Sequence, residues 1–283
     1  MHMIKTQLRA KIQNNWPLYL AAVLVTLIMR YFARTSDTDV LKWILAPTAG
    51  WAGILGGISF EYMPHQGYVN HGYQFLIAAS CSGCRFMLLT FLMLVFMPES
   101  RGSSISENVY TGQLLQGDTV LHEPHRGRKD VQCKCRWLVF CITLAYLFTI
   151  FVNGIRIVLA IRLPILLDRL HLFHEWLTPD RLHTLIGTVV YFTALCVLYL
   201  RVTLTTDRNR LFVPVFWYLS IVLLLPFAKR LWYHEWTGFG EYAVSVAGAC
   251  IVVWAVVFSI FFRKASKKGK RYCKGYFPVL EYK

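Results

Sequence analysis

Three residues of this sequence carry side chains that together could perform acyl transfer: Cys81, Arg156 and His183. A thiol is a strong nucleophile only as the thiolate, so it needs a neighbouring base or positive charge. A histidine can accept the thiol proton and later protonate a leaving amine. A guanidinium stays charged and can stabilise the thiolate or a tetrahedral oxyanion. If they converge in space, these residues suffice for a cysteine peptidase or transpeptidase.

The composition predicts that the solvent around most of the chain is lipid. The sequence has 283 residues, of which 56% are hydrophobic and only 16% are charged. About a quarter of the residues in a soluble domain are charged. The apolar residues fall in long blocks, which is typical of membrane-spanning helices. We therefore expect an all-α fold, a polytopic transmembrane helix bundle.

The apolar blocks predict six to seven spans. They run over Trp16–Phe32, Leu41–Phe60, Phe75–Met97, Trp137–Ala160, His183–Leu200, Leu211–Ala228 and Tyr242–Phe262. The second block contains Pro47 and several glycines, which permit re-entry from one face or a position along the outer face. The alternative is seven full spans with the N-terminus outside.

The distribution of charge favours the topology in which Leu41–Phe60 does not cross the membrane fully. The net charge is +15, and the basic residues cluster between the apolar blocks, most densely in the tail Arg263–Lys274. Such clusters lie on the cytoplasmic side of spans and so argue against a nucleic-acid partner. With them in the cytoplasm, Cys81, Arg156 and His183 all lie toward the outer face of the membrane. Ionisable residues within spans are functional candidates because the bilayer penalises them.

The segments around these residues resemble the motifs of the exosortase/archaeosortase family. Ala79–Phe86 reads ASCSGCRF and resembles the family's nucleophile motif. Asn153–Leu163 reads NGIRIVLAIRL and resembles its Asn-x-x-Arg-Ile motif. Arg181–Tyr191 reads RLHTLIGTVVY and resembles its His-x-x-x-Gly motif. The three segments follow the family's order.

The resemblance extends from about Trp16 to Arg201, and it is closest to the exosortase K branch. That branch is indicated by the stretch LKWILAPT at Leu41–Thr48 and by Gly67-Tyr68. It implies a core at 1–203 that contains a cytoplasmic loop at 98–136. The remainder, 204–283, then adds two transmembrane helices and a basic cytoplasmic tail.

The resemblance implies a membrane peptidase or transpeptidase of the inner membrane, with its site facing outward. Such enzymes recognise exported proteins that end in a short motif, a transmembrane helix and a basic cluster. They cut at the motif through a thioester and pass the new carboxyl terminus to an amine or lipid acceptor, with no cofactor and no metal. Cys81, Arg156 and His183 carry over as catalytic residues. Asn153, one helical turn before Arg156, is a supporting residue that either orients Arg156 or has a capping or packing role.

Three other interpretations stay open at this stage. Cys81 and Cys84 form a Cys-x-x-Cys pair, so the chain could be a membrane thiol-disulfide oxidoreductase, although that leaves Arg156 and His183 unexplained. Zinc is a weaker alternative, because the spacing of four candidate ligands fits no established zinc pattern; they are His122, His125, Cys133 and Cys135. A transporter would need internal repeats, and none is visible.

Overall fold

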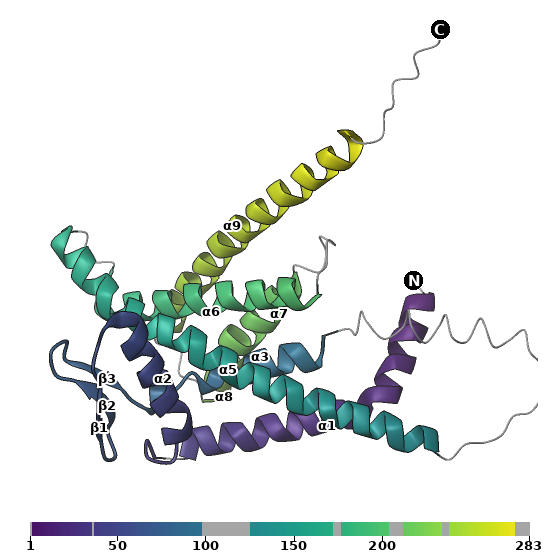
Figure 1. Cartoon of the computed structure of the whole chain (residues 1–283), viewed down its shortest axis with the longest axis horizontal. Coiled ribbons are helices and arrows are strands. Elements are labelled where there is room, and N and C mark those ends of the chain that lie inside the picture. The colour runs from purple at the N-terminus through teal and green to yellow at the C-terminus, as the bar shows by residue number, and fades with distance from the viewer. Residues whose placement is uncertain are drawn as a thin grey trace, which may run out of the picture. The chain divides into compact units, whose positions relative to one another are not determined.

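The computed structural model describes residues 2–35, 37–97, 125–171, 177–203, 212–233 and 238–274. These residues form long helices and one small sheet (Figure 1). The chain divides into two compact units, Met1–Gly154 and Ile155–Lys283, which are described separately. The domain boundary predicted at residue 203 marks the end of the family resemblance and not the edge of a compact unit. It stays a prediction.

Within the described residues, four helical segments are long and apolar enough to cross a membrane. They are Lys134–Arg169, Pro179–Thr203, Phe212–Trp232 and Phe239–Ile260. A shorter apolar helical stretch covers Ala79–Val95. The protein is therefore a polytopic, mostly helical membrane protein, as its composition predicts. The larger number of six to seven spans is not confirmed.

The first unit contains α1 (His2–Thr35), α2 (Lys42–Gly56) and α3 (Cys84–Val95), together with α5 (His125–Arg169) as far as Gly154. Helices α1 and α3 pack together, and the rings of Tyr19 and Phe96 stack with centroids 4.8 Å apart. Helix α2 has 15 residues. At a rise of 1.5 Å per residue this is about 22 Å, less than the roughly 30 Å of a bilayer's hydrocarbon core. A helix of this length cannot cross the core unaided.

Helix α2 is fastened to α5 by two hydrogen bonds. The indole of Trp51 donates to the carbonyl of Phe151 at 3.3 Å, and the hydroxyl of Tyr146 donates to the carbonyl of Trp43 at 2.9 Å. A Cβ added at Gly154 would lie 2.4 Å from the Trp51 ring, so that glycine lets the two helices approach closely. The short helix is therefore held at a fixed position on α5.

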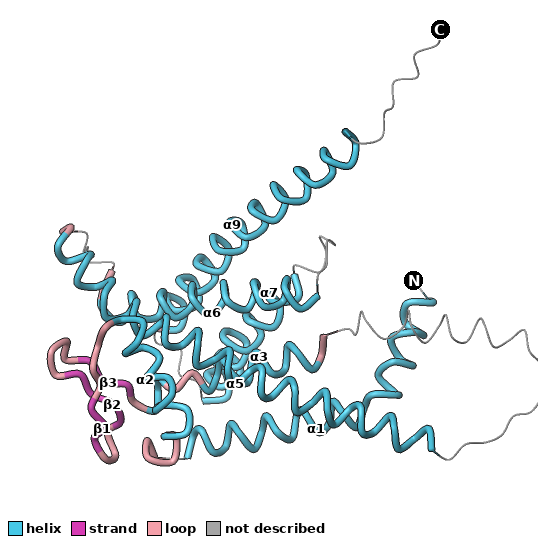
Figure 2. The backbone as a smooth tube through the Cα atoms, viewed as in Figure 1, coloured by secondary structure: helices cyan, strands magenta, loops and turns pink. Residues whose placement is uncertain are grey.

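A small antiparallel sheet follows α2 and corrects the all-α prediction (Figure 2). Its strands are β1 (Glu61–Met63), β2 (Gly67–Asn70) and β3 (Phe75–Ile77), in the order β1-β2-β3. Strand β3 occupies the start of the predicted span Phe75–Met97, so the helix there begins only at Cys84. Strands of three or four residues are too short to give a recognisable alternation in sequence.

The predicted cytoplasmic loop 98–136 is partly helical. Residues 98–124 lie outside the described part of the chain, but α5 begins at His125 and has 45 residues. Its last turns continue through Pro164 to Arg169. Proline removes one helical hydrogen bond but need not end a helix when the flanking residues are apolar and helix-compatible.

The second unit contains the end of α5 and the helices α6 (Pro179–Thr203), α7 (Phe212–Leu219), α8 (Leu225–Tyr233) and α9 (Phe239–Lys274). Helix α6 packs against α9 and α7. Arg181 and Glu241, in the first turns of α6 and α9, form a hydrogen-bonded ion pair, so the N-terminal ends of these two helices lie side by side.

A π-helical segment, Ser220–Leu224, joins α7 to α8 and has a local cause. Pro226 has no N–H, so it cannot donate to the carbonyl of Val222 as the fourth residue along an α-helix normally does. The hydroxyl of Tyr242, on α9, donates to that carbonyl at 3.5 Å. The Tyr242 hydroxyl thus gives the Val222 carbonyl the hydrogen bond that Pro226 cannot donate, and the wider π turn makes room for the proline, as in other interrupted membrane helices.

Candidate active site

Cys81 lies in a tight loop that we call the Cys81 loop, Ala79–Gly83. Residues Ala79–Cys81 form a single 3₁₀ turn, and Gly83 precedes α3 as its N-cap. The Cys81 side chain is buried, with 8% exposed. The Ser80 hydroxyl lies 4.0 Å from the Cys81 sulfur and donates weakly to it.

Asn153 of α5 holds the Cys81 loop. Its side-chain amide donates to the carbonyl oxygen of Cys81 at 2.7 Å, and the side chain is completely buried. The sequence predicts that Asn153 either orients Arg156 or has a capping or packing role. The structure shows that Asn153 binds the backbone of the cysteine that we predict to be the nucleophile. This bond joins the first two motifs of the family resemblance within one compact unit.

Gly83 lets the loop lie against α5. Its φ of 74° is in the left-handed region, and an added Cβ would lie 3.0 Å from the Thr149 methyl and 3.1 Å from the Asn153 amide nitrogen. A larger residue here would have to adopt a strained backbone conformation and also push Asn153 away from the Cys81 carbonyl. The glycine of the Cys-Ser-Gly motif is therefore needed for the position of the cysteine.

We predict that Gly83→Ala lowers the free energy of unfolding by roughly 1–3 kcal/mol, because strain and overpacking coincide at this position. Thermal unfolding of the purified full-length chain in detergent measures this change. Gly50→Ala in α2 is the matched control, since an added Cβ there meets nothing within 4 Å. The control should be neutral or slightly stabilising. Equal stabilities for the two variants would contradict the assigned role of Gly83.

Arg156 and His183 meet in the second unit. Nη2 of Arg156 lies 2.6 Å from Nε2 of His183. A guanidinium has only donors, so Nε2 must accept this bond, and a neutral His183 then carries its proton on Nδ1. Gly187, one turn after His183, makes room for the arginine, because a Cβ there would lie 3.3 Å from Nε of Arg156. The guanidinium also lies over the Tyr191 ring, 5.5 Å from its centroid.

The four predicted site residues are divided between the two compact units. Cys81 and Asn153 form one pair in the first unit, and Arg156 and His183 form another in the second. Both pairs use α5, which carries Asn153 and Arg156 three residues apart. Each pair is thus built on this helix together with one other segment.

Comparison with known proteins adds no family to this geometry. The chain matches no protein-family model, no curated protein and no solved structure. The functional argument therefore rests on the residues and their contacts.

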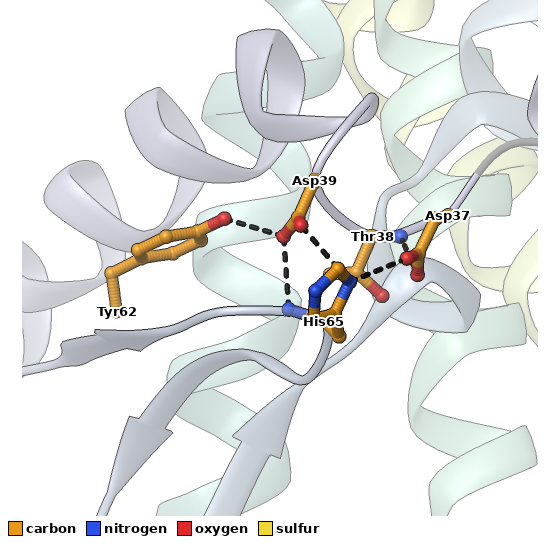
Figure 3. Close-up of polar contacts among 5 residues, drawn as sticks. All are labelled: Asp37, Thr38, Asp39, Tyr62 and His65. Atoms are coloured by element: carbon orange, nitrogen blue, oxygen red, sulfur yellow. Dashed lines mark hydrogen bonds and ion pairs between the residues drawn. The ribbon is translucent and has the colours of Figure 1, made fainter.

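A second polar cluster, which sequence reasoning missed, joins the start of α2 to the sheet (Figure 3). Nδ1 of His65 lies 2.8 Å from a carboxylate oxygen of Asp37 and 3.1 Å from one of Asp39. Asp39 also accepts from the Tyr62 hydroxyl at 2.5 Å and from the His65 backbone N–H at 3.0 Å. The cluster fastens the β1–β2 turn to the segment before α2.

Asp37, Asp39 and His65 are also a group whose side chains could hold a metal ion. Their ligand atoms lie within 4.8 Å of one another. The ion pairs among them account for the same geometry without a metal. The side chains of His122, His125 and Cys133, which we considered as zinc ligands, lie outside the described residues.

The charges of the cluster stabilise one another. The hydrogen bond from His65, followed by the backbone bond from Thr38, lowers the pKa of Asp37. The Tyr62 hydroxyl and then the His65 N–H lower the pKa of Asp39, and the same bond raises the pKa of Tyr62 to about 12. Asp37 and Asp39 in turn raise the pKa of His65 above its ordinary value of 6.5. Asp37 and His65 are exposed, and Asp39 and Tyr62 are partly exposed, so salt screens the interaction.

We predict a pH optimum for the attachment of the β1–β2 turn. The raised pKa of His65 means that its contribution is complete below 6.5 and is lost as the pH rises through the folded pKa. The lowered pKa values of Asp37 and Asp39 mean that their contribution is present above 3.8 and is lost as the pH falls through the folded values. Hydrogen-exchange protection of the β1–β2 amides should therefore be highest between these limits.

The matched variant is His65→Asn. His65 has a φ of 63°, which asparagine also tolerates, so the substitution removes the charge and keeps the turn. Protection in this variant should no longer fall as the pH rises above neutrality. An unchanged fall would show that another group controls the turn.

Proposed function

We propose that this chain is a membrane cysteine peptidase or transpeptidase that cleaves C-terminal sorting tails of exported proteins through a thioester on Cys81. The observation that carries the proposal is the hydrogen bond from the Asn153 side chain to the Cys81 carbonyl. A buried amide that fixes the backbone of a cysteine at a helix N-terminus is the support that a positioned nucleophile needs. The bond also connects the segment that resembles the nucleophile motif to the segment that resembles the Asn-x-x-Arg-Ile motif.

In the proposed reaction the Cys81 thiolate attacks the scissile carbonyl carbon. His183 takes the thiol proton on Nε2 and returns it to the amide nitrogen as the C–N bond breaks, which leaves a thioester on Cys81. Attack by an amine or by water then releases the thiol and completes transfer or hydrolysis. All bonds formed and broken are accounted for without a cofactor or a metal.

Arg156 has two tasks in this scheme. In the resting protein its guanidinium donates to Nε2 of His183 and holds the imidazole neutral. When the tetrahedral oxyanion forms, the same guanidinium turns to the new negative charge, and Nε2 becomes available to the proton. A cation accelerates the reaction only if it stabilises the transition state more than it stabilises the bound substrate.

The membrane topology completes the proposal. We infer an inner-membrane location with the Cys81 loop at the outer face and the basic tail in the cytoplasm. The substrate is an exported protein whose tail helix enters between the enzyme's helices, with its own basic end in the cytoplasm. The acceptor is an amine, a lipid amine or water.

The test is the processing of an exported reporter fused to a candidate tail, produced with the wild-type enzyme or with Cys81→Ala. Loss of the shorter product in the variant supports the proposal. Equal processing of the reporter by the wild-type enzyme and by Cys81→Ala contradicts it.

A thiol-disulfide oxidoreductase is the second candidate, and one observation favours it. Cys84 is the first residue of α3, so the Cys81–Cys84 pair brackets a helix N-terminus, and both thiols are free. Redox-active Cys-x-x-Cys pairs are also found at helix N-termini. Such an enzyme would need both cysteines and would have no use for the Arg156–His183 bond.

A further inference from the structure

The three-stranded sheet ends in an open strand beside the Cys81 loop. Within the described residues, β2 is the strand that pairs with β3, so the other side of β3 is a sheet edge. An edge of this kind presents backbone N–H and C=O groups to any extended chain that approaches it. Strand β3 ends at Ile77, and Cys81 follows four residues later through the extended residue Ala78.

The register of the sheet identifies the groups that point outward. A Cβ added at Gly67 would lie 2.3 Å from the carbonyl oxygen of Ile77, so that oxygen points toward β2. Successive residues of an antiparallel strand alternate in this direction. Leu76, which lies opposite Val69, must therefore direct its N–H and C=O away from β2, toward the open edge. Its side chain is on the outer face and is 43% exposed.

The two edges of the sheet differ in how they are protected. Natural edge strands avoid unwanted pairing with charged residues, proline or bulges. Strand β1 carries Glu61 and is followed by Pro64. Strand β3 is Phe-Leu-Ile and is flanked by Gln74 and Ala78, so it carries no charge and no proline, and only its short length limits pairing. The less protected edge is the one that leads to the candidate nucleophile.

The sheet is also held in place at its far side. The Asp37–Asp39–His65 cluster fastens the β1–β2 turn (Figure 3). On the inner face, the buried side chain of Ile77 lies opposite Tyr68, and β2 packs against α2. An edge that is already fixed before a partner binds costs little ordering entropy on binding.

We propose that the open edge of β3 binds the scissile motif of the substrate as an added, extended strand. Backbone hydrogen bonds from Leu76 then hold the peptide while the adjoining loop presents Cys81 to one of its carbonyls. The occupant is the extended segment between the exported domain and the tail helix, because strand addition requires free backbone groups and an extended conformation. This inference rests on the proposed peptidase function and adds the mode of substrate recognition.

The test uses acetyl-tetra-alanyl chloromethyl ketone as an extended probe of backbone recognition. The Cys81 thiolate forms a C–S bond with its methylene carbon, and chloride leaves, so the reaction needs no oxidant. Chloroacetamide is the small control reagent, because it reaches the same thiol without a strand. The purified full-length chain in detergent is treated with each reagent, and the rate constants for Cys81 are obtained by mass spectrometry.

The expected quantity is the rate for the peptide probe relative to that for chloroacetamide. Leu76→Pro removes the outward N–H while leaving the bonds to β2 intact, and it should lower this ratio about fivefold, the effect of one net hydrogen bond. Leu76→Ala keeps the N–H and should retain the ratio. On the wild-type chain, N-methylation of single amides of the probe should produce a similar loss at one or more positions.

The outcomes separate this inference from the function on which it rests. Equal ratios for the wild type, for Leu76→Pro and for every N-methylated probe would overturn strand addition, while reporter processing by the wild type would leave the peptidase proposal standing. A Cys81 that reacts with neither reagent, together with processing that survives Cys81→Ala, would contradict both.

Discussion

Replacing Cys81 with alanine should stop processing of an exported tail reporter, with a fall in rate on the order of 10³-fold or more. In the proposed mechanism the thioester forms on this sulfur, so the alanine variant lacks the nucleophile for covalent catalysis. The residual rate is what substrate binding and oxyanion stabilisation provide without a nucleophile. Pulse-labelling of the reporter, with the processed fraction followed over time, measures the effect.

Cys84→Ala is the matched control, since Cys84 is a second buried thiol three residues along the chain. It should keep most of the processing activity, and immunoblots should show equal amounts of both variants in the membrane. If the two variants lose activity to the same degree while both remain at wild-type levels, the single-nucleophile mechanism is wrong. The dithiol interpretation would then explain the chain better.

The helical architecture could be predicted because its signal is local. An apolar run longer than about 18 residues has few alternatives to a spanning helix, since lipid leaves its backbone groups no other partner. The four long helices at Lys134–Arg169 and beyond lie on predicted blocks. The same reasoning overestimates helix at Phe75–Ile77, where an apolar run is a short strand, because hydropathy alone does not distinguish a buried strand from a helix start.

The supporting contacts of the site could not be predicted from sequence, because they join distant segments. Asn153 and the Cys81 carbonyl are 72 residues apart. A motif match placed Asn153 near Arg156, its neighbour on the helix, and gave no indication of the loop that it binds. The Arg156–His183 contact spans 27 residues and follows from the packing of α6.

The Asp37–Asp39–His65 cluster has one indication outside its own contacts, the backbone of His65, which only the structure shows. Pro64 followed by a residue with positive φ makes a turn in which glycine or asparagine is usual, and the Gln66 N–H bonds to the Met63 carbonyl at 3.2 Å. Histidine at such a position is uncommon enough to suggest a second task. Its partners precede α2, so the pairing again depends on tertiary structure.

The second large effect is expected from Arg156→Lys, which keeps the positive charge and removes the planar guanidinium. We expect processing to fall by roughly 10²–10³-fold, the effect of removing one donor to a developing oxyanion. An ammonium group on a shorter stem cannot hold the bond to Nε2 of His183 and then turn to the oxyanion with the same geometry. The processed fraction of the reporter measures this loss.

Arg162→Lys is the matched control, since Arg162 is an exposed residue on the same helix, and this variant should process the reporter at close to the wild-type rate. The nitrogen NMR spectrum of His183 gives a readout that a purely structural role would not move. In the wild type, a proton on Nδ1 is expected because Nε2 accepts from Arg156. In Arg156→Lys the Nε2–H tautomer should gain population. Full processing by Arg156→Lys, with the His183 tautomer unchanged, would remove Arg156 from the mechanism and leave its bond to His183 as packing alone.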